Sequence, residues 1–164
     1  MSPIHIRPQR VFDAKRFFEI LNNPNFKYFN ARPKSIAYEK EWLKKNPKKR
    51  KNNEEYNYTI TYNNKVIGGM GVTLHAKRKF IGEIGYFLDE KYWGQGFATQ
   101  AVKQLEKICF TKLKLTRIEI VMVDKHKASE KVAIKCGYKK EGKMKKSILN
   151  KGEYYDAYLY AKTK

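Results

Sequence analysis

The segment Trp93-Gly94-Gln95-Gly96-Phe97-Ala98-Thr99 constrains the fold of this chain more than any other segment. It follows the apolar run Tyr86-Phe87-Leu88, which resembles a strand, and it leads into residues 98–112, where apolar side chains recur at helical spacing. Glycines let a chain turn tightly and leave its backbone N–H groups accessible. The first N–H groups of a helix are free, and the positive end of the helix dipole lies beside them. This strand–loop–helix unit predicts a site for a pyrophosphate in a fold of mixed α/β class.

The spacing of the glycines excludes two common nucleotide-binding loops. No Gly-Lys-Ser/Thr follows, as a P-loop requires, and the second glycine pair of the dinucleotide fingerprint is missing. Two glycines between a strand and a helix are a weak signal by themselves. An ordinary turn therefore stays an alternative until other segments are considered.

Periodicity places the remaining elements around this unit. The predicted strands are residues 4–7, 56–62, 66–72, 82–88, 118–123, 148–149 and 154–161. The predicted helices are residues 13–22, 35–45, 98–112 and 129–136. Asp13 is expected to cap the first helix, and Gly137 to follow the last one.

Length and composition predict one domain, residues 1–164, because 41% of the residues are apolar and can form a core without disulfides. No stretch approaches the ~20 apolar residues that span a bilayer, and residues 1–7 lack the apolar run of a secretory signal. We therefore expect a cytoplasmic protein with no membrane partner. Cys109 and Cys136 lie far apart and in no CxxC arrangement, which predicts buried thiols and no metal site. Cys136 as a nucleophile is the alternative, although no His or Asn/Asp partner can be placed beside it.

The net charge of +20, from 36 Lys plus Arg against 16 Asp plus Glu, is the strongest signal in the composition. Such a surface attracts phosphates, whether of nucleotide cofactors, of RNA or of anionic membranes. A lysine-rich genome is the simpler explanation, because the lysines are scattered as well as clustered. The densest run, residues 44–51, holds no apolar residue and is expected to be a solvated loop, with a polyanion-binding loop as the alternative.

Three segments together resemble the GNAT acetyltransferases, most closely the branch of ribosomal-protein N-terminal acetyltransferases and polyamine acetyltransferases. They are GEIGYFLDEKYWGQGFATQAV, LTRIEIVMVDKHKASEKVAIKCGYKKEG and NKGEYYDAYLYA. The resemblance covers about residues 56–160, whereas residues 7–45 match only by the placement of helices. It implies the GNAT acyl-CoA N-acyltransferase fold, with a central mixed, mostly antiparallel sheet flanked by helices.

The resemblance implies acetyl-CoA as co-substrate and no metal. The backbone N–H groups of residues 95–99 would hold the pyrophosphate, and the strand at residues 86–88 would splay from its neighbour and pair with the pantetheine. Trp93 stands where the family usually has Gln or Arg. The residues implied in cofactor binding are Tyr86, Phe87, Leu88, Trp93, Gly94, Gln95, Gly96, Phe97, Ala98, Thr99, His126 and Ser129.

Acyl transfer to an amine needs a base for the amine and an acid for the departing sulfur. The position of the family's usual acid, a tyrosine, is Ala133, which cannot serve. The ribosomal branch has a serine instead, and Ser129 fits it, although Ser129 also suits the start of a helix. His126 replaces the family's asparagine and would contact pantetheine or order water. A simple loop residue is the alternative, and the flanking lysines favour exposure.

The resemblance does not identify the base, because the position of the family's usual glutamate is Val121 in this chain. Glu83 and Glu119 each interrupt an apolar strand, where a carboxylate is costly unless it is paired or faces a cleft. We take Glu83 as the candidate catalytic base. An outward-facing glutamate is the alternative, and His75 is a third candidate.

These features predict an acetyl-CoA-dependent N-acetyltransferase that acts on a primary amine, either a protein N-terminus such as that of a ribosomal protein or a small amine. The cationic surface should repel a polyamine, which favours a peptide N-terminus. The alternative is an RNA- or ribosome-binding protein on a GNAT scaffold with weak or no catalysis. The high net charge of the chain favours this alternative, whereas the intact phosphate loop favours the enzyme. A monomer and a homodimer are both open.

Overall fold

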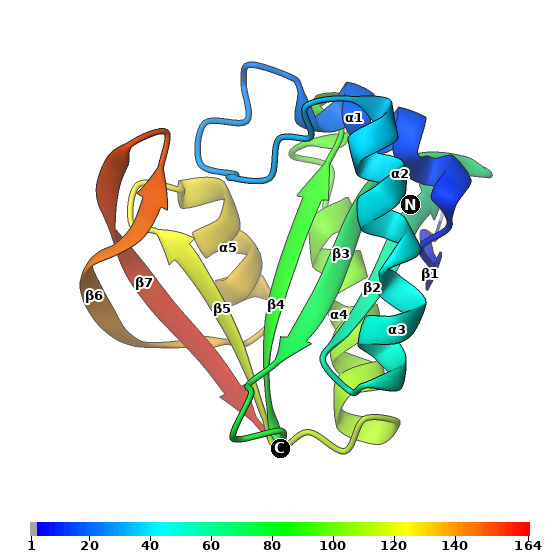
Figure 1. The fold of residues 1–164 in the computed structure, drawn as a ribbon. Coiled ribbons are helices and arrows are strands. Elements are labelled where there is room, and N and C mark those ends of the chain that lie inside the picture. The colour runs from blue at the N-terminus through cyan, green and yellow to red at the C-terminus, as the bar shows by residue number, and fades with distance from the viewer. Residues whose placement is uncertain (1–2) are drawn as a thin grey trace.

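The computed structural model describes residues 3–164, which form a seven-stranded sheet flanked by helices (Figure 1). The strands are β1 (His5–Pro8), β2 (Glu55–Tyr62), β3 (Lys65–Leu74), β4 (Ile81–Leu88), β5 (Arg117–Val123), β6 (Lys139–Asn150) and β7 (Glu153–Thr163). The α-helices are α1 (Ala14–Leu21), α2 (Ile36–Lys44), α3 (Asn46–Lys51), α4 (Phe97–Thr111) and α5 (Lys127–Lys135). Two short 3-10 helices are η1 (Val11–Asp13) and η2 (Glu90–Tyr92).

The sheet has the strand order β1-β2-β3-β4-β5-β7-β6, and every neighbouring pair is antiparallel except β4 and β5. This arrangement confirms the predicted mixed, mostly antiparallel sheet. The four helices expected from periodicity are present as α1, α2, α4 and α5. Both cysteines are buried, as predicted. Within residues 3–164, no helix is long and apolar enough to cross a membrane.

Two apolar clusters cover the two faces of the sheet, because successive residues of a strand point to opposite faces. On one face, Ile84 and Leu88 of β4 pack with the buried side of α4, including Leu105. On the other face, Phe87 packs with Phe17 of α1 at a ring-centroid distance of 5.3 Å. By the same alternation, Glu83 projects from the face that carries α1.

The parallel strands β4 and β5 are paired at only three positions, Ile81 with Arg117, Gly82 with Ile118 and Glu83 with Glu119. Beyond these pairs, β4 stays bonded to β3 and β5 stays bonded to β7 up to their carboxyl ends. The two strands therefore diverge, and within residues 3–164 no strand pairs with the inner edge of β4 after Glu83.

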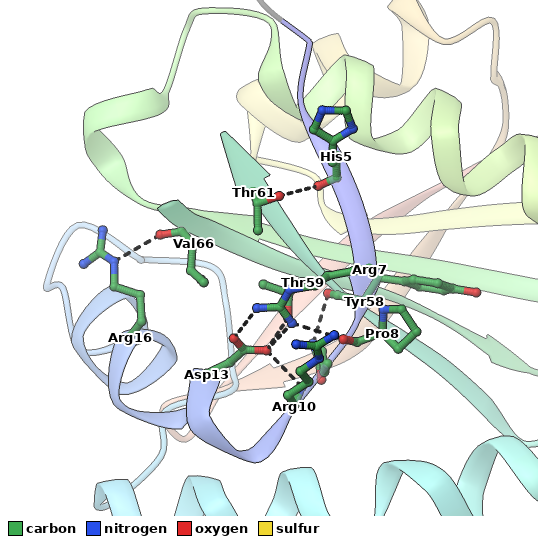
Figure 2. A network of polar contacts seen from close by, with 11 residues as sticks. His5, Arg7, Pro8, Arg10, Asp13, Arg16, Tyr58, Thr59, Thr61 and Val66 are labelled. Carbon is green, nitrogen blue, oxygen red and sulfur yellow. Dashed lines mark hydrogen bonds and ion pairs between the residues drawn. The ribbon is translucent and has the colours of Figure 1, made fainter. Parts of the chain in front are cut away.

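A buried carboxylate joins the first strand to the rest of the sheet (Figure 2). Asp13 is 1% exposed and accepts hydrogen bonds from Arg7 Nη2 at 2.6 Å, Thr59 Oγ1 at 2.7 Å and the backbone N–H of Arg10 at 2.9 Å. It occupies the predicted N-cap position of α1, but its side chain does not cap the helix. Burial alone would raise the pKa of Asp13, yet these hydrogen bonds outweigh it and lower the pKa.

Two lysine-rich segments differ from the sequence prediction. The run expected as a solvated loop at residues 44–51 is mostly α3, because Pro47 lies in the first turn, where a helix needs no N–H donor. Asn46 at its start is buried and donates to Gln9 Oε1 at 2.8 Å, which fixes the helix on the sheet. Strand β6 begins at Lys139, well before the predicted residue 148, and its register is irregular near Gly142.

Candidate active site

A cleft of about 510 Å³ opens at the carboxyl end of β4, where this strand diverges from β5. It is lined by residues 25–29, 86–88, 92–94, 96–99, His126, Ala128, Ser129, Lys131, Val132 and Lys135. All the residues predicted to bind the cofactor line it except Gln95, whose side-chain Nε2 donates to the carbonyl of Lys91 at 2.8 Å. The cleft therefore gathers segments that are far apart in the sequence around one loop.

The loop before α4 presents a row of free backbone donors. Gly94 and Gly96 have positive φ angles of 73° and 82°, which glycine adopts without a steric penalty. Gly96 is the N-cap of α4, and no side chain caps the helix. Within residues 3–164, the N–H groups of residues 94–99 donate no hydrogen bond, and the first donor of the helix to be satisfied is that of Gln100. Such a row at the positive end of a helix is suited to an anion.

Two lysines add positive charge to the same cleft. Lys131 and Lys135 lie four residues apart on α5, and both line the cleft opposite the loop. The sequence prediction missed them because lysines are scattered over the whole chain. Only the packing of α5 beside α4 distinguishes these two from the others.

Trp93 has a structural explanation. Its indole Nε1 donates to the carbonyl of Leu88 at 2.8 Å, and its ring packs against Phe26 with centroids 5.4 Å apart. A polar residue here would lose the contact with Phe26. The tryptophan thus fixes the loop after β4 against the segment at residues 25–29, which the sequence did not assign to the site.

Ser129 and Tyr86 form a hydrogen-bonded pair inside the cleft. Their hydroxyl oxygens are 3.0 Å apart, and Ser129 is 7% exposed. Burial raises the pKa of Tyr86 to about 12, against a smaller lowering by the hydrogen bond with Ser129. Ser129 is not the helix cap that the sequence allowed, because His126 occupies the N-cap position of α5.

Sequence reasoning also missed the side chain of Tyr86, since only its backbone was assigned a role. Strand alternation was a usable signal, because Tyr86 has the same parity as Ile84 and Leu88 and so faces α4 and α5. His126 is also less exposed than its lysine neighbours suggested. Its ring lies 5.4 Å from that of Tyr28, and burial lowers its pKa, which favours the neutral imidazole.

Glu83 does not line the cleft. It lies on the opposite face of the sheet, at the last pair before β4 and β5 diverge, with Glu119 beside it. Although its side chain reaches solvent, partial desolvation by the sheet raises its pKa, and the charge of Glu119 adds to the effect. Glu119 itself accepts a hydrogen bond from Arg117 Nε at 2.6 Å.

The other candidate groups lie outside the cleft. His75 is exposed in the loop before β4, at the end of the strand away from the cleft. Burial raises the pKa of the Cys136 thiol, which disfavours the thiolate that a nucleophile needs. Its Sγ lies 3.7 Å from the carbonyl of Thr99, as expected of a structural thiol.

Two asparagines connect the β6–β7 hairpin to residues 25–30, which form the outer wall of the cleft. Asn150, at the end of β6, donates through Nδ2 to the carbonyl of Lys27 at 2.7 Å. In return, Asn30 donates to the carbonyl of Leu149 at 2.8 Å. Tyr28 packs between His126 and Tyr155 within the same wall. The β6–β7 hairpin therefore positions residues 25–30 over the cleft.

Comparison with known proteins agrees with this geometry. The sequence profile of the Acetyltransferase (GNAT) domain matches residues 4–139, so the chain belongs to the GNAT acetyltransferase family. It is an N-acetyltransferase, as its relatives are. One is the SPbeta prophage-derived uncharacterized N-acetyltransferase YokL of Bacillus subtilis (strain 168), with 29% identity over 148 residues, which cover 89% of this chain and 79% of YokL.

Two solved structures share the fold. The ribosomal L7/L12 alpha-N-protein acetyltransferase RimL in complex with coenzyme A has a TM-score of 0.90 and 21% identity, over 99% of this chain and 95% of that one. The microcin C7 self-immunity acetyltransferase MccE in complex with acetyl-CoA and AMP has a TM-score of 0.90 and 21% identity, over 100% and 94%. At these identities the likeness establishes the fold.

Proposed function

We propose that this N-acetyltransferase uses acetyl-CoA as its co-substrate and transfers the acetyl group to the α-amine of a peptide, with residues 1–164 acting as one catalytic domain. The observation that carries the proposal is the row of free N–H donors at residues 94–99, at the start of α4. The residues present fit the cofactor, because donors without partners need an anion and Lys131 and Lys135 face the same cleft. The complexes of RimL with coenzyme A and of MccE with acetyl-CoA support the same assignment.

The binding roles follow from the geometry of the cleft. Residues 94–99 hold the pyrophosphate through their backbone, and the two lysines of α5 balance its charge. The inner edge of β4 at residues 86–88 offers free backbone groups to the pantetheine amides, because β5 has diverged from it. Trp93, Phe97 and His126 form the surrounding walls.

The proposed acid is Ser129. Acetyl-CoA, when bound, supplies an acetyl group activated as a thioester. Ser129 Oγ holds a proton in the cleft and delivers it to the departing sulfur, and the second proton that the acetylated nitrogen loses restores the hydroxyl. Tyr86, whose pKa of about 12 keeps its hydroxyl protonated at neutral pH, orients Ser129 through their 3.0 Å hydrogen bond.

The proposed base is Glu83, which lies across the sheet from Ser129. Its raised pKa makes the carboxylate a stronger proton acceptor than an ordinary glutamate, and it takes a proton from the incoming ammonium, directly or through water. An acid on one face and a base on the other imply that the amine approaches from the face that carries α1. It then meets the cleft where β4 and β5 part.

A peptide N-terminus suits the charge of the protein better than a polyamine. At a net charge of +20, long-range repulsion disfavours a polycation, whereas a peptide brings one positive charge together with neutral or acidic residues. RimL, which has the same fold, is named for α-N-acetylation of a ribosomal protein.

The first test is binding. Acetyl-CoA at about 100 times its Kd stabilises a protein by about 2.7 kcal/mol, which a thermal shift detects easily. We expect the shift at both low and moderate salt. The absence of any shift would contradict the proposal and favour a GNAT scaffold that has lost catalysis.

The second test is acetyl transfer to a panel of N-terminal peptides, polyamines and amino acids. Ser129→Ala and Glu83→Gln should each lower kcat by about 10²-fold or more, the usual range for a lost acid or base, while the thermal shift with acetyl-CoA persists. Tyr86→Phe, which keeps the ring, should lower kcat less than Ser129→Ala. Unchanged kcat in Ser129→Ala would exclude it as the acid.

A further inference from the structure

The end of the molecule opposite the cleft gathers basic segments that are distant in the sequence (Figure 1). Lys79 in the loop between β3 and β4 donates to the carbonyl of Asn53, just after α3, at 2.7 Å. The carbonyl of Phe80 in the same loop accepts from the N–H of Thr116, which follows α4, at 3.0 Å. These bonds bring the end of α3, the β3–β4 loop and the α4–β5 connection to one place.

This region, which we name the cationic end, carries the exposed side chains Lys51, Lys77, Arg78, Lys79, Lys112 and Lys114. Within residues 3–164, none of the six lies within 4.0 Å of a carboxylate. The basic β6 differs, because Lys140 and Lys143 there are paired with Glu130 and Asp124. The positive field of the cationic end is therefore not neutralised locally.

Among the acidic side chains near this end, Glu54 has no cationic partner within residues 3–164, whereas three others are already paired with cations. Glu55 is paired with Lys49 at 2.8 Å, and both Glu119 and Glu141 are paired with Arg117. The attraction of the cationic end for a polyanion is correspondingly strong at low salt.

Phe80 directly follows Lys79 in the β3–β4 loop and is 53% exposed. Its backbone is fixed, because its carbonyl accepts from the N–H groups of both Thr116 and Arg117. An exposed aromatic ring in a basic loop offers a surface on which a base stacks while nearby cations contact the flanking phosphates.

A membrane surface fits less well. Peripheral binding needs several apolar side chains on one face, in addition to positive charge. Among the large apolar residues that are exposed within residues 3–164, only Phe80 belongs to the segments of the cationic end. One ring is too little apolar area for insertion but is enough to stack on one base.

We propose that the cationic end binds single-stranded nucleic acid, a function beyond acetyl transfer. It lies at the amino end of β4, whereas the cleft lies at the carboxyl end. Eight residues of strand at about 3.3 Å each separate the two by about 25 Å. Both ligands can therefore be bound at once, and the two functions are tested separately.

The test is fluorescence anisotropy with labelled single-stranded RNA and DNA oligonucleotides of about a dozen nucleotides, between 50 and 200 mM KCl. Six phosphate contacts give a slope of about −4 in log Kobs against log salt. The triple variant Lys77→Gln, Arg78→Gln, Lys79→Gln should reduce the slope by about 2. Phe80→Ala should weaken binding about tenfold, the cost of one lost stacking contact.

The matched control removes the same charge elsewhere. Lys15→Gln, Lys34→Gln and Lys40→Gln change exposed lysines on α1, before α2 and on α2, and none of the three has an ion pair among the residues that the structure describes. This triple should retain most of the affinity, and both triples should keep the wild-type thermal shift with acetyl-CoA. Equal losses in the two triples would mean that binding follows net charge alone and would overturn the proposal. Binding to phosphatidylserine vesicles with no binding to either oligonucleotide would also overturn it.

Discussion

Gly94 shows how a single residue sets the shape of the proposed phosphate site. Its φ of +73° lies in the left-handed region, although nothing within 4 Å would contact an added methyl group. An alanine at this position therefore acts through backbone strain and not through a clash. Gly85 on β4 also has nothing within 4 Å of an added methyl group, but it has no positive φ.

We expect Gly94→Ala to bind acetyl-CoA about tenfold more weakly, because an L-residue in the left-handed region costs about 1–2 kcal/mol. Gly85→Ala is the matched control and should leave the affinity unchanged. Isothermal titration with acetyl-CoA measures both. Equal affinities in the two variants would mean that the loop conformation does not hold the ligand.

Asp13 stabilises the fold through its charge. Because the folded state lowers its pKa, the stabilisation is complete above the unfolded pKa, near 3.8, and is lost as the pH falls through the folded pKa. Asp13→Asn removes the charge and weakens its bonds to Arg7 and Thr59.

We expect Asp13→Asn to lose about 2 kcal/mol of unfolding free energy at pH 7, as for other hydrogen bonds to a charged group. Below pH 4 the wild type should lose part of this advantage, so the two urea-unfolding curves should converge. Glu19→Gln, on the exposed surface of α1, serves as the control. A difference between wild type and Asp13→Asn that is constant from pH 3 to pH 7 would contradict the role of the charge.

At the scale of elements, the β6–β7 hairpin holds the loop at residues 25–30 over the cleft. Asn150 is 2% exposed, so replacing its amide removes a buried donor from the carbonyl of Lys27. Asn30 makes the reciprocal bond but is exposed, so water can replace it.

Asn150→Ala should therefore destabilise the protein by about 1–2 kcal/mol and raise hydrogen exchange at residues 25–30. Asn30→Ala should have a clearly smaller effect on both. Hydrogen exchange followed by mass spectrometry reports the local change. Exchange confined to residues 150–155 would show that the hairpin does not hold the loop.

Periodicity predicted most elements, because an apolar face recurs in α1, α4 and α5 and in the strands of the sheet. It failed for α3 and for the first part of β6, where charged residues, mostly lysines, occupy most positions and hide any alternation. Their folding depends on buried contacts such as that of Asn46 with Gln9, which no local pattern records.

The candidate site likewise has a part that the sequence predicted and a part that it did not. The phosphate loop was predictable, since its glycines and its helix are contiguous in the sequence. The pairing of Tyr86 with Ser129 and the wall at residues 25–29 depend on contacts between distant segments. The pairing of Glu83 with Glu119, at the last position before the strands diverge, followed only once the register of β4 with β5 was known.

At the scale of the whole molecule, a net charge of +20 means that the folded protein repels itself. Salt screens this repulsion, because the Debye length falls from about 30 Å at 0.01 M to about 10 Å at 0.1 M. Raising KCl from 10 to 200 mM should therefore increase Tm by a few degrees, since each 1 kcal/mol is worth about 2–4 °C at this size. The Tm of the triple variant of Lys77, Arg78 and Lys79 should increase less over the same range of KCl. A Tm that falls with KCl would show that attractive ion pairs dominate.

The divergence of β4 and β5 also has a mechanical consequence. The sheet is continuous from β1 to β4 and from β5 to β6, yet its two halves are joined to each other at only three residue pairs. Between other neighbouring strands, a pulling force is distributed over many backbone hydrogen bonds, whereas between β4 and β5 very few bonds carry it. Under tension applied across the strands, β4 and β5 should therefore separate first. A ligand bound to both strands would raise the force needed to separate them.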